Sequence, residues 1–126
     1  MAFMLPIHKQ QRKHNLGIAG EYFVTAELTR RGIHASMTYG NAKKADVIAF
    51  SPEKNNCVVI EVKTTGQKSW VVGGKLPEKS DLVWVFVLLI DNDSPRYFIL
   101  TGEQLNTVLT PQDCRYVRPY GTVYAK

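Results

Sequence analysis

The nine residues from Leu82 to Ile90, LVWVFVLLI, form the longest apolar run in the chain. This length is about half of what a membrane-spanning helix needs. A short, continuous apolar run bounded by polar residues is typical of a strand that is buried on both faces. We therefore predict that Leu82–Ile90 is a central strand of a sheet.

The segments on either side of this run predict the rest of the fold. Asn15 is a suitable N-cap and Gly32 a suitable stop for a helix that ends after Arg30 and Arg31. Thr101 and Gln104 have the spacing of a capping box, which predicts a short second helix. Further strands are predicted at 33–38, 45–50, 57–63, 70–72 and 96–100. This order predicts one α/β domain over residues 1–126, with a mixed sheet of about five strands flanked by helices.

The net charge of +5 lies in the first third of the chain. From residue 45 onward nine basic residues balance nine acidic ones. Residues 1–14 are predicted to be a basic, flexible arm ahead of the first helix. Such a bias suits nucleic acid as first partner and an anionic membrane as second, and a solvated basic helix end is the other interpretation. The charge comes from Lys9, Arg12, Lys13, Arg30, Arg31, Lys43 and Lys44 against Glu21 and Glu27.

The two cysteines indicate the compartment. Cys57 and Cys114 lie far apart in the sequence and form no CxxC pair. This pattern favours a reducing compartment, with Cys57 in the core. The opening residues lack the order of a signal peptide. We therefore expect a cytoplasmic protein with no membrane partner.

The predicted strand 57–63, CVVIEVK, carries two charges at its apolar end. Side chains alternate along a strand, so Glu61 and Lys63 share one face. A hairpin at 51–56 would bring Asp46 across from Glu61 or Lys63. The two carboxylates, the backbone carbonyl of Val62 and waters would form an all-oxygen site suited to Mg²⁺ or Mn²⁺. The other interpretation is an exposed cross-strand ion pair that contributes little.

A lysine beside such a metal has a clear use in phosphodiester hydrolysis. Lys63 could orient or deprotonate the attacking water, or stabilise the pentavalent phosphorus. The arrangement Asp46…Glu61-Val62-Lys63 resembles the signature of the PD-(D/E)XK nuclease superfamily. The resemblance extends roughly from Leu16 to Leu109, and it includes small Holliday-junction resolvases, Mrr-type enzymes and restriction endonucleases.

This resemblance implies a restriction-endonuclease-like core and a role for each acidic residue. Asp46 and Glu61 would be metal ligands and Lys63 the catalytic lysine. Glu21, in the helix GEYFVTAELTRRG, would be a third acid at the metal or its waters. The other interpretation of Glu21 is a solvated helix acid paired with a nearby base. Ala45 stands where the family pattern has Pro.

Several polar residues around these positions are candidates for binding nucleic acid. We predict phosphate contacts from Lys43, Lys44, Lys68, Thr64, Gln67, Arg12 and Lys13. Trp70 could pack on a base, but we expect it to be a core residue.

The expected function is a Mg²⁺-dependent DNA endonuclease that recognises DNA structure more than sequence. Cutting two strands needs two sites, so we expect a homodimer, with Leu105, Val108, Leu109 and the Tyr-bearing tail available for its interface. One alternative is a non-catalytic nucleic-acid-binding or partner-binding module on the same fold. Another is a nuclease subunit of a defence or mobile-element system that needs a protein partner. RNA stays open as a substrate.

Overall fold

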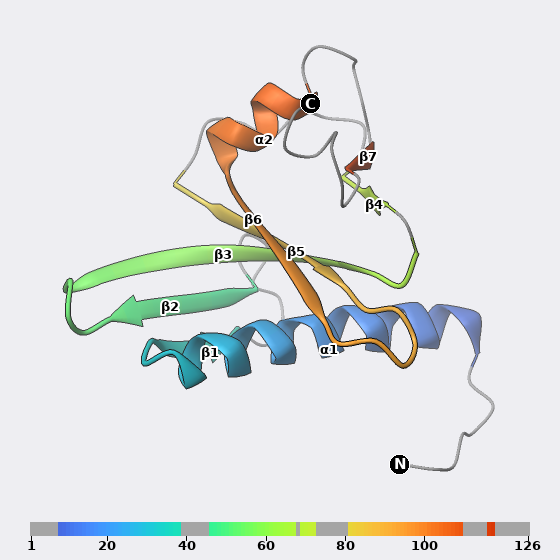
Figure 1. Ribbon diagram of the computed structural model, residues 1–126, viewed down its shortest axis with the longest axis horizontal. Helices are drawn as coiled ribbons and strands as arrows, with labels where there is room; N and C mark the ends of the chain where they lie inside the picture. The colour runs from blue at the N-terminus through green and yellow to red at the C-terminus, as the bar shows by residue number, and fades with distance from the viewer. Residues whose placement is uncertain (1–7, 39–45, 68, 73–80, 110–115, 118–126) are drawn as a thin grey trace.

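The computed structural model describes residues 8–38, 46–67, 69–72, 81–109 and 116–117 (Figure 1). Two helices and seven strands lie in these ranges. Their order along the chain is α1 (Lys9–Arg30), β1 (His34–Met37), β2 (Val47–Ser51), β3 (Asn56–Thr65), β4 (Trp70–Val71), β5 (Val83–Leu88), β6 (Arg96–Thr101), α2 (Gly102–Leu109) and β7 (Tyr116–Val117).

Five of the strands form one mixed sheet in the order β1-β2-β3-β5-β6. The pairs β1–β2, β2–β3 and β5–β6 are antiparallel, and β3–β5 is parallel. β4 and β7 form a separate antiparallel pair. β5 lies between β3 and β6 and is buried from Val85 to Leu88. The predicted fold class and the buried central strand are therefore confirmed.

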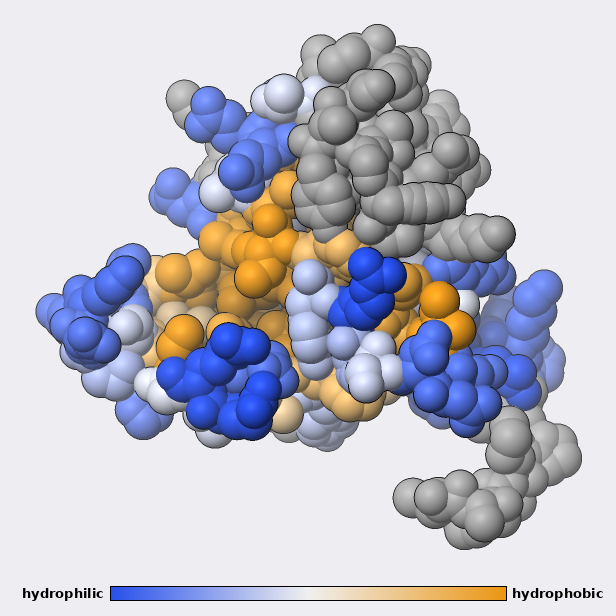
Figure 2. Space-filling model, in the orientation of Figure 1, coloured by the Kyte–Doolittle hydropathy of each residue, from blue (hydrophilic) through white to orange (hydrophobic). Residues whose placement is uncertain are grey.

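The sheet has a different cover on each face. Helix α1 lies against β1, β2 and β3, and the core there contains Val24, Val47, Ala49, Ile60, Val62, Val85 and Val87. Helix α2 lies against β6 and β5, and the core there contains Trp70, Phe86, Leu88, Phe98, Leu100 and Leu105. Figure 2 shows apolar residues gathered over the centre of the sheet, with hydrophilic residues around its lower and left rims.

Helix α1 begins earlier than the sequence analysis predicted. It starts at Lys9 after His8, and Asn15 lies inside it. Residues 9–14, KQQRKH, are mostly good helix formers, and the Asn15 side chain accepts a hydrogen bond of 2.9 Å from Nε2 of Gln11. The prediction of a flexible arm over residues 1–14 is thus wrong for residues 9–14, and residues 1–7 lie outside the described ranges. The predicted stop is confirmed, with Gly32 at a φ of +89°.

Other local predictions are confirmed. The hairpin between β2 and β3 pairs Ser51 with Asn56. The capping box is reciprocal: the Thr101 N–H donates to Oε1 of Gln104 at 2.9 Å, and the Gln104 N–H donates to Oγ1 of Thr101 at 3.1 Å. Trp70 is a core residue, because its side chain is buried and its Nε1 donates to the Val87 carbonyl at 3.0 Å.

Two expectations are wrong. Cys57 is exposed, because it lies near the outer end of β3, whereas α2 packs on β6 and β5. Leu105 is fully buried against the sheet of its own chain, so it is not available for a dimer interface. The side chains of Val108 and Leu109 and all of Cys114 lie outside the described part. No helix among the described residues is long and apolar enough to cross a membrane.

Candidate functional site

The candidate site lies where β2 begins beside the last half of β3. The register pairs Val47 with Ile60, so Asp46 lies across from Glu61, as predicted. The Asp46 N–H donates to the Ile60 carbonyl at 2.9 Å. The Asp46 carboxylate accepts a hydrogen bond of 2.9 Å from the backbone N–H of Val62. The side chain of Asp46 therefore continues the β2–β3 ladder by one bond.

The direction of the Val62 carbonyl follows from the same hydrogen bond. In a β-strand the N–H and C=O of one residue point to the same side. The Val62 N–H points toward Asp46, so the Val62 carbonyl also faces the side of β3 on which Asp46 lies. Thr65 has the opposite direction, because its carbonyl accepts from the Leu89 N–H at the end of β5. The Asp46 carboxylate and the Val62 carbonyl thus lie along one edge of β3.

The alternation along β3 separates the core residues from the charged ones. Ile60 and Val62 are buried beneath α1. Glu61 and Lys63 point to the other face and are half-buried, as the alternation predicted. On that face Glu61 pairs in register with Trp84 of β5. The Nζ of Lys63 lies 6.0 Å from the centroid of the Trp84 ring.

The two glutamates of the site, Glu21 and Glu61, have raised pKa values near Asp46. Burial, a hydrogen bond with the Asp46 carboxyl and the Asp46 charge raise the pKa of Glu61 from 4.5 to about 7, against the opposing effect of Lys63. Burial and the Asp46 charge raise the pKa of Glu21 from 4.5 to about 7. A carboxylate whose charge raises the pKa of another acid lies close to that acid. The structure thus brings Glu21, Asp46, Glu61 and Lys63 into one neighbourhood.

Glu21 reaches this neighbourhood because α1 and β3 approach closely. The preceding residue, Gly20, is buried and packs directly on the side chain of Thr64. A Cβ at position 20 would overlap the Thr64 side chain, so only glycine permits this approach. The same contact buries the Thr64 hydroxyl, which has no hydrogen-bond partner in the described part of the chain. The predicted phosphate contact from Thr64 is therefore not possible in this arrangement, because its hydroxyl faces α1.

The structure brings together fewer metal ligands than the sequence analysis predicted. Within the described ranges, no three His, Cys, Asp or Glu side chains lie close enough to form a metal site. The pair Asp46 and Glu61, with the Val62 carbonyl on the same edge of β3, is the part of the predicted ligand set that the geometry brings together. Glu21 is close enough to feel the charge of Asp46.

Some of the residues predicted to contact nucleic acid lie in the described part of the chain, and others lie outside it. Lys43, Lys44 and Lys68 lie outside the described residues. Gln67 is exposed just after β3, and its N–H donates to Oγ1 of Thr65 at 3.1 Å. Arg12 and Lys13 are exposed on α1. An open groove on α1 is lined by Gln10, Lys13, His14, Gly17, Ile18 and Glu21, so it runs from basic residues to the candidate site.

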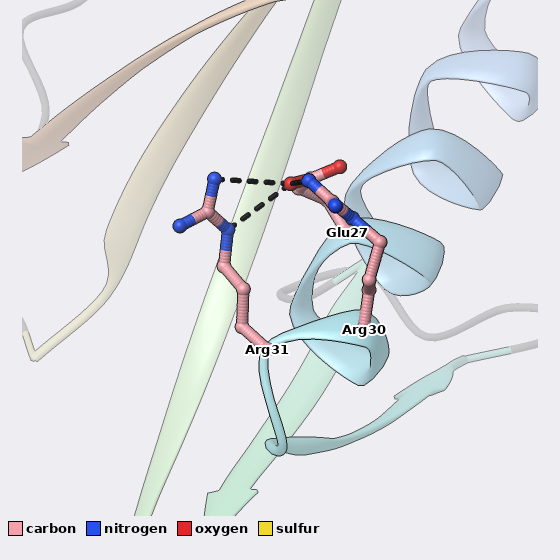
Figure 3. A network of polar contacts seen from close by, with 3 residues as sticks. All are labelled: Glu27, Arg30 and Arg31. Carbon is pink, nitrogen blue, oxygen red and sulfur yellow. Dashed lines mark hydrogen bonds and ion pairs between the residues drawn. The ribbon is translucent and has the colours of Figure 1, made fainter.

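Two other basic residues, at the C-terminal end of α1, have an acidic partner. Figure 3 shows Arg30 and Arg31 converging on Oε1 of Glu27, at 2.7 and 3.0 Å. The hydrogen bond from Arg30 is the main reason that the pKa of Glu27 lies below its usual range. These arginines are at the opposite end of α1 from Arg12 and Lys13, and in the described part of the chain the latter two form no ion pair.

Sequence reasoning did not single out Trp84, the neighbour of both Glu61 and Lys63. Alternation within Leu82–Ile90 would have placed Trp84 and Phe86 on one face of a strand. The parallel register between β3 and β5 then sets these two residues beside Glu61 and Lys63. That register has no local signal in the sequence, because the two strands are far apart in the chain.

The chain was compared with known proteins. No protein-family model matches it, and no curated protein matches its sequence. Among solved structures it is similar to Archaeoglobus fulgidus Hjc, a Holliday junction resolvase from an archaeal hyperthermophile. The sequence identity is 17%, the TM-score is 0.49, and the match covers 70% of this chain and 74% of that one.

Proposed function

We propose that this protein is a divalent-metal-dependent endonuclease that hydrolyses DNA phosphodiester bonds. The observation that carries the proposal is the crowding of acidic groups beside Lys63 at one end of β3. Two glutamates with a pKa of about 7 flank Asp46 in a half-buried setting. A divalent cation would relieve their mutual repulsion, and perturbed carboxylates beside a lysine are typical of catalytic sites.

The oxygen atoms of this edge suit a hard cation. The carboxylates of Asp46 and Glu61 and the Val62 carbonyl would hold Mg²⁺ or Mn²⁺ together with waters. Bound there, the ion would supply neutralisation of the charge that builds on the phosphate. Glu21 would hold a water of this site by a hydrogen bond.

Lys63 would act on the water or on the phosphate. Its ammonium is close enough to Glu61 to oppose the rise in the pKa of that carboxyl. From this position it can donate hydrogen bonds that orient the attacking water or stabilise charge on a phosphate oxygen. Asp46 holds the end of β3 in place through its bond to Val62, which fixes Glu61 and Lys63 on either side.

DNA would approach along α1. The groove from Lys13 and His14 to Glu21 offers the Lys13 ammonium to neighbouring phosphates and ends at the acidic site. We assign Arg12, Lys13 and Gln67 to backbone contacts, together with Lys43, Lys44 and Lys68 from outside the described residues. Such contacts read shape and position more than base sequence. The proposal also includes a homodimer with two sites and a cytoplasmic location. Its alternatives are a nuclease that needs a protein partner and a nuclease that acts on RNA.

The test is cleavage of a supercoiled plasmid, a four-way junction and a linear duplex with Mg²⁺, Mn²⁺ or EDTA. Lys63→Ala is compared with the parent and with Lys54→Ala, which removes an exposed lysine at the far end of the same hairpin. We expect cutting that needs the metal, is lost in Lys63→Ala and is kept in Lys54→Ala. Equal cutting by parent and Lys63→Ala would refute the assigned role of Lys63.

Metal binding separates an enzyme from a binding-only module on this fold. Mn²⁺ affinity is measured by calorimetry on the parent, Glu61→Ala and Glu53→Ala. Glu53 is an exposed acid of the hairpin turn and serves as the matched control. We expect Glu61→Ala alone to lose Mn²⁺. The parent protein could instead bind DNA without binding Mn²⁺ and without cutting. That result would refute the nuclease proposal and support a binding-only module.

A further inference from the structure

Trp84 is the aromatic residue that lies against the proposed catalytic lysine. The parallel register places it beside Glu61, and the Nζ of Lys63 lies over its ring at 6.0 Å from the centroid. An ammonium at this distance over an aromatic face is attracted by the negative face of the ring, and Trp is the strongest such partner. The long lysine side chain otherwise has many rotamers of similar energy.

The ring of Trp84 also contacts other aromatic side chains. It stacks on Phe86 with a centroid distance of 6.3 Å and an interplanar angle of 16°. Phe86 is fully buried and makes an edge contact with Trp70 at 5.3 Å. A row of three aromatic rings therefore connects the hydrophobic core to the ammonium of Lys63.

Hydrogen bonding does not explain how Trp84 is oriented. The indole N–H of Trp70 donates to the Val87 carbonyl at 3.0 Å. The indole nitrogen of Trp84 is also buried, yet among the described residues it has no hydrogen-bond partner. Leaving a buried N–H without an acceptor is unfavourable. The ring packs against the buried core cluster, stacks on Phe86 and offers a face to Lys63.

We infer that Trp84 is a positioning residue that holds the Lys63 ammonium beside Glu61. Its catalytic consequence rests on the proposed nuclease function, whereas the contact between ring and ammonium does not. Trp84 touches neither water nor phosphate in this role. It acts by limiting the rotamers of Lys63 to those that keep Nζ at the acidic end of β3.

The kinetic test compares Trp84→Leu with Trp84→Phe on the DNA that the parent cuts best in Mg²⁺. Trp84→Leu should lower kcat by about tenfold with little change in KM, and Trp84→Phe should restore most of the activity because it keeps a ring. Phe98→Leu is the control for lost stability alone. Phe98 is a core residue on β6 with its own cationic neighbour, Arg96, at 5.2 Å. Its variant should unfold at a lower temperature with kcat unchanged.

The second readout does not need activity. The NMR signal of the Lys63 Cε protons is assigned by its absence from the spectrum of Lys63→Met. In the parent protein, the ring current of Trp84 should shift this signal upfield. This shift should persist in Trp84→Phe and disappear in Trp84→Leu. An unchanged Lys63 shift in Trp84→Leu, or an unchanged kcat in an active enzyme, would overturn the inference. If the parent cuts no DNA, the proposed function fails, and the Lys63 shift alone decides whether Trp84 positions the ammonium.

Discussion

The carboxylate of Asp46 accepts a hydrogen bond of 2.9 Å from the backbone N–H of Val62. One side chain thereby serves two purposes, because it extends the β2–β3 ladder and sets a negative charge beside Glu61 and Glu21. The hydrogen bond stabilises the fold and the charge repulsion destabilises it. The two contributions can be separated by substitution.

The first prediction separates them at Asp46. In EDTA, Asp46→Ala should lower the free energy of unfolding by about 1–2 kcal/mol, because a partly buried N–H loses its acceptor. Asp46→Asn keeps an acceptor oxygen and removes the charge, so its stability should equal or exceed that of the parent. Both variants should lose Mn²⁺ binding and cleavage. Urea unfolding measures the stabilities, and an Asp46→Asn variant as unstable as Asp46→Ala would contradict this division.

The second prediction concerns pH. The pKa of Glu21 and of Glu61 is about 7 in the folded chain and near 4.5 when unfolded. The folded state therefore binds more protons between these values. In EDTA the stability that depends on these protons is complete below pH 4.5 and is lost as the pH rises through 7. Urea unfolding at a series of pH values measures this loss.

The control for the pH dependence is the exposed acid of the hairpin. Glu61→Gln should flatten the curve between pH 5 and 8, which are about the limits of the titration. Glu53→Gln should leave the curve as it is in the parent. Mg²⁺ added at the upper end of the range should restore the lost stability, because the ion replaces the protons. A parent whose stability rises over the same range would show that other groups dominate.

Much of the site could be predicted from the sequence because its geometry is local. Alternation alone puts Glu61 and Lys63 on one face, and a short hairpin fixes Asp46 across from Glu61. The capping box of α2 is equally local. These features depend on residues a few positions apart or joined by one tight turn. They were confirmed for that reason.

The features that sequence analysis missed depend on distant packing. The strand pattern around Cys57 indicates burial, but Cys57 lies near the outer end of β3, whereas α2 packs on β6 and β5. Leu105 has the pattern of an available apolar residue, and its burial depends on where α2 packs on the sheet. Trp84 meets Lys63 only through the register of two parallel strands. Local sequence patterns do not indicate these contacts between distant segments.

The third prediction concerns the charge of Lys63. Its ammonium opposes the rise in the pKa of Glu61. Lys63→Met should therefore raise the pKa of Glu61 further, which NMR titration of the Glu61 carboxyl carbon measures. The same variant should lower the cleavage rate by about a hundredfold or more. Lys63→Arg should keep the effect on the pKa without restoring the rate, because the guanidinium has a different shape.

The control for this prediction is Lys54→Met in the exposed hairpin turn. Neither the Glu61 titration nor the cleavage rate should change in that variant. A Glu61 titration that is the same in Lys63→Met and in the parent would show that the ammonium does not lie near this carboxyl in solution.

The last prediction tests the approach of α1 to β3 with two glycines of the same helix. A Cβ added at Gly20 would overlap the side chain of Thr64, whereas a Cβ added at Gly17 meets nothing within 4 Å. Gly20→Ala should lower the free energy of unfolding by about 1–3 kcal/mol, because the helix must move away from the sheet. Gly17→Ala should raise it by about 0.5–1 kcal/mol through helix propensity.

The movement of α1 has a consequence for the site. Glu21 follows Gly20 directly, and part of its raised pKa comes from the charge of Asp46. If Gly20→Ala pushes the helix away, burial and repulsion both decrease and the pKa of Glu21 should fall back toward 4.5. Gly17→Ala should leave that pKa near 7. NMR titration of the Glu21 carboxyl carbon distinguishes the two, and a Gly20→Ala protein that is both stable and unchanged at Glu21 would show that the close contact with Thr64 does not hold Glu21 at the site.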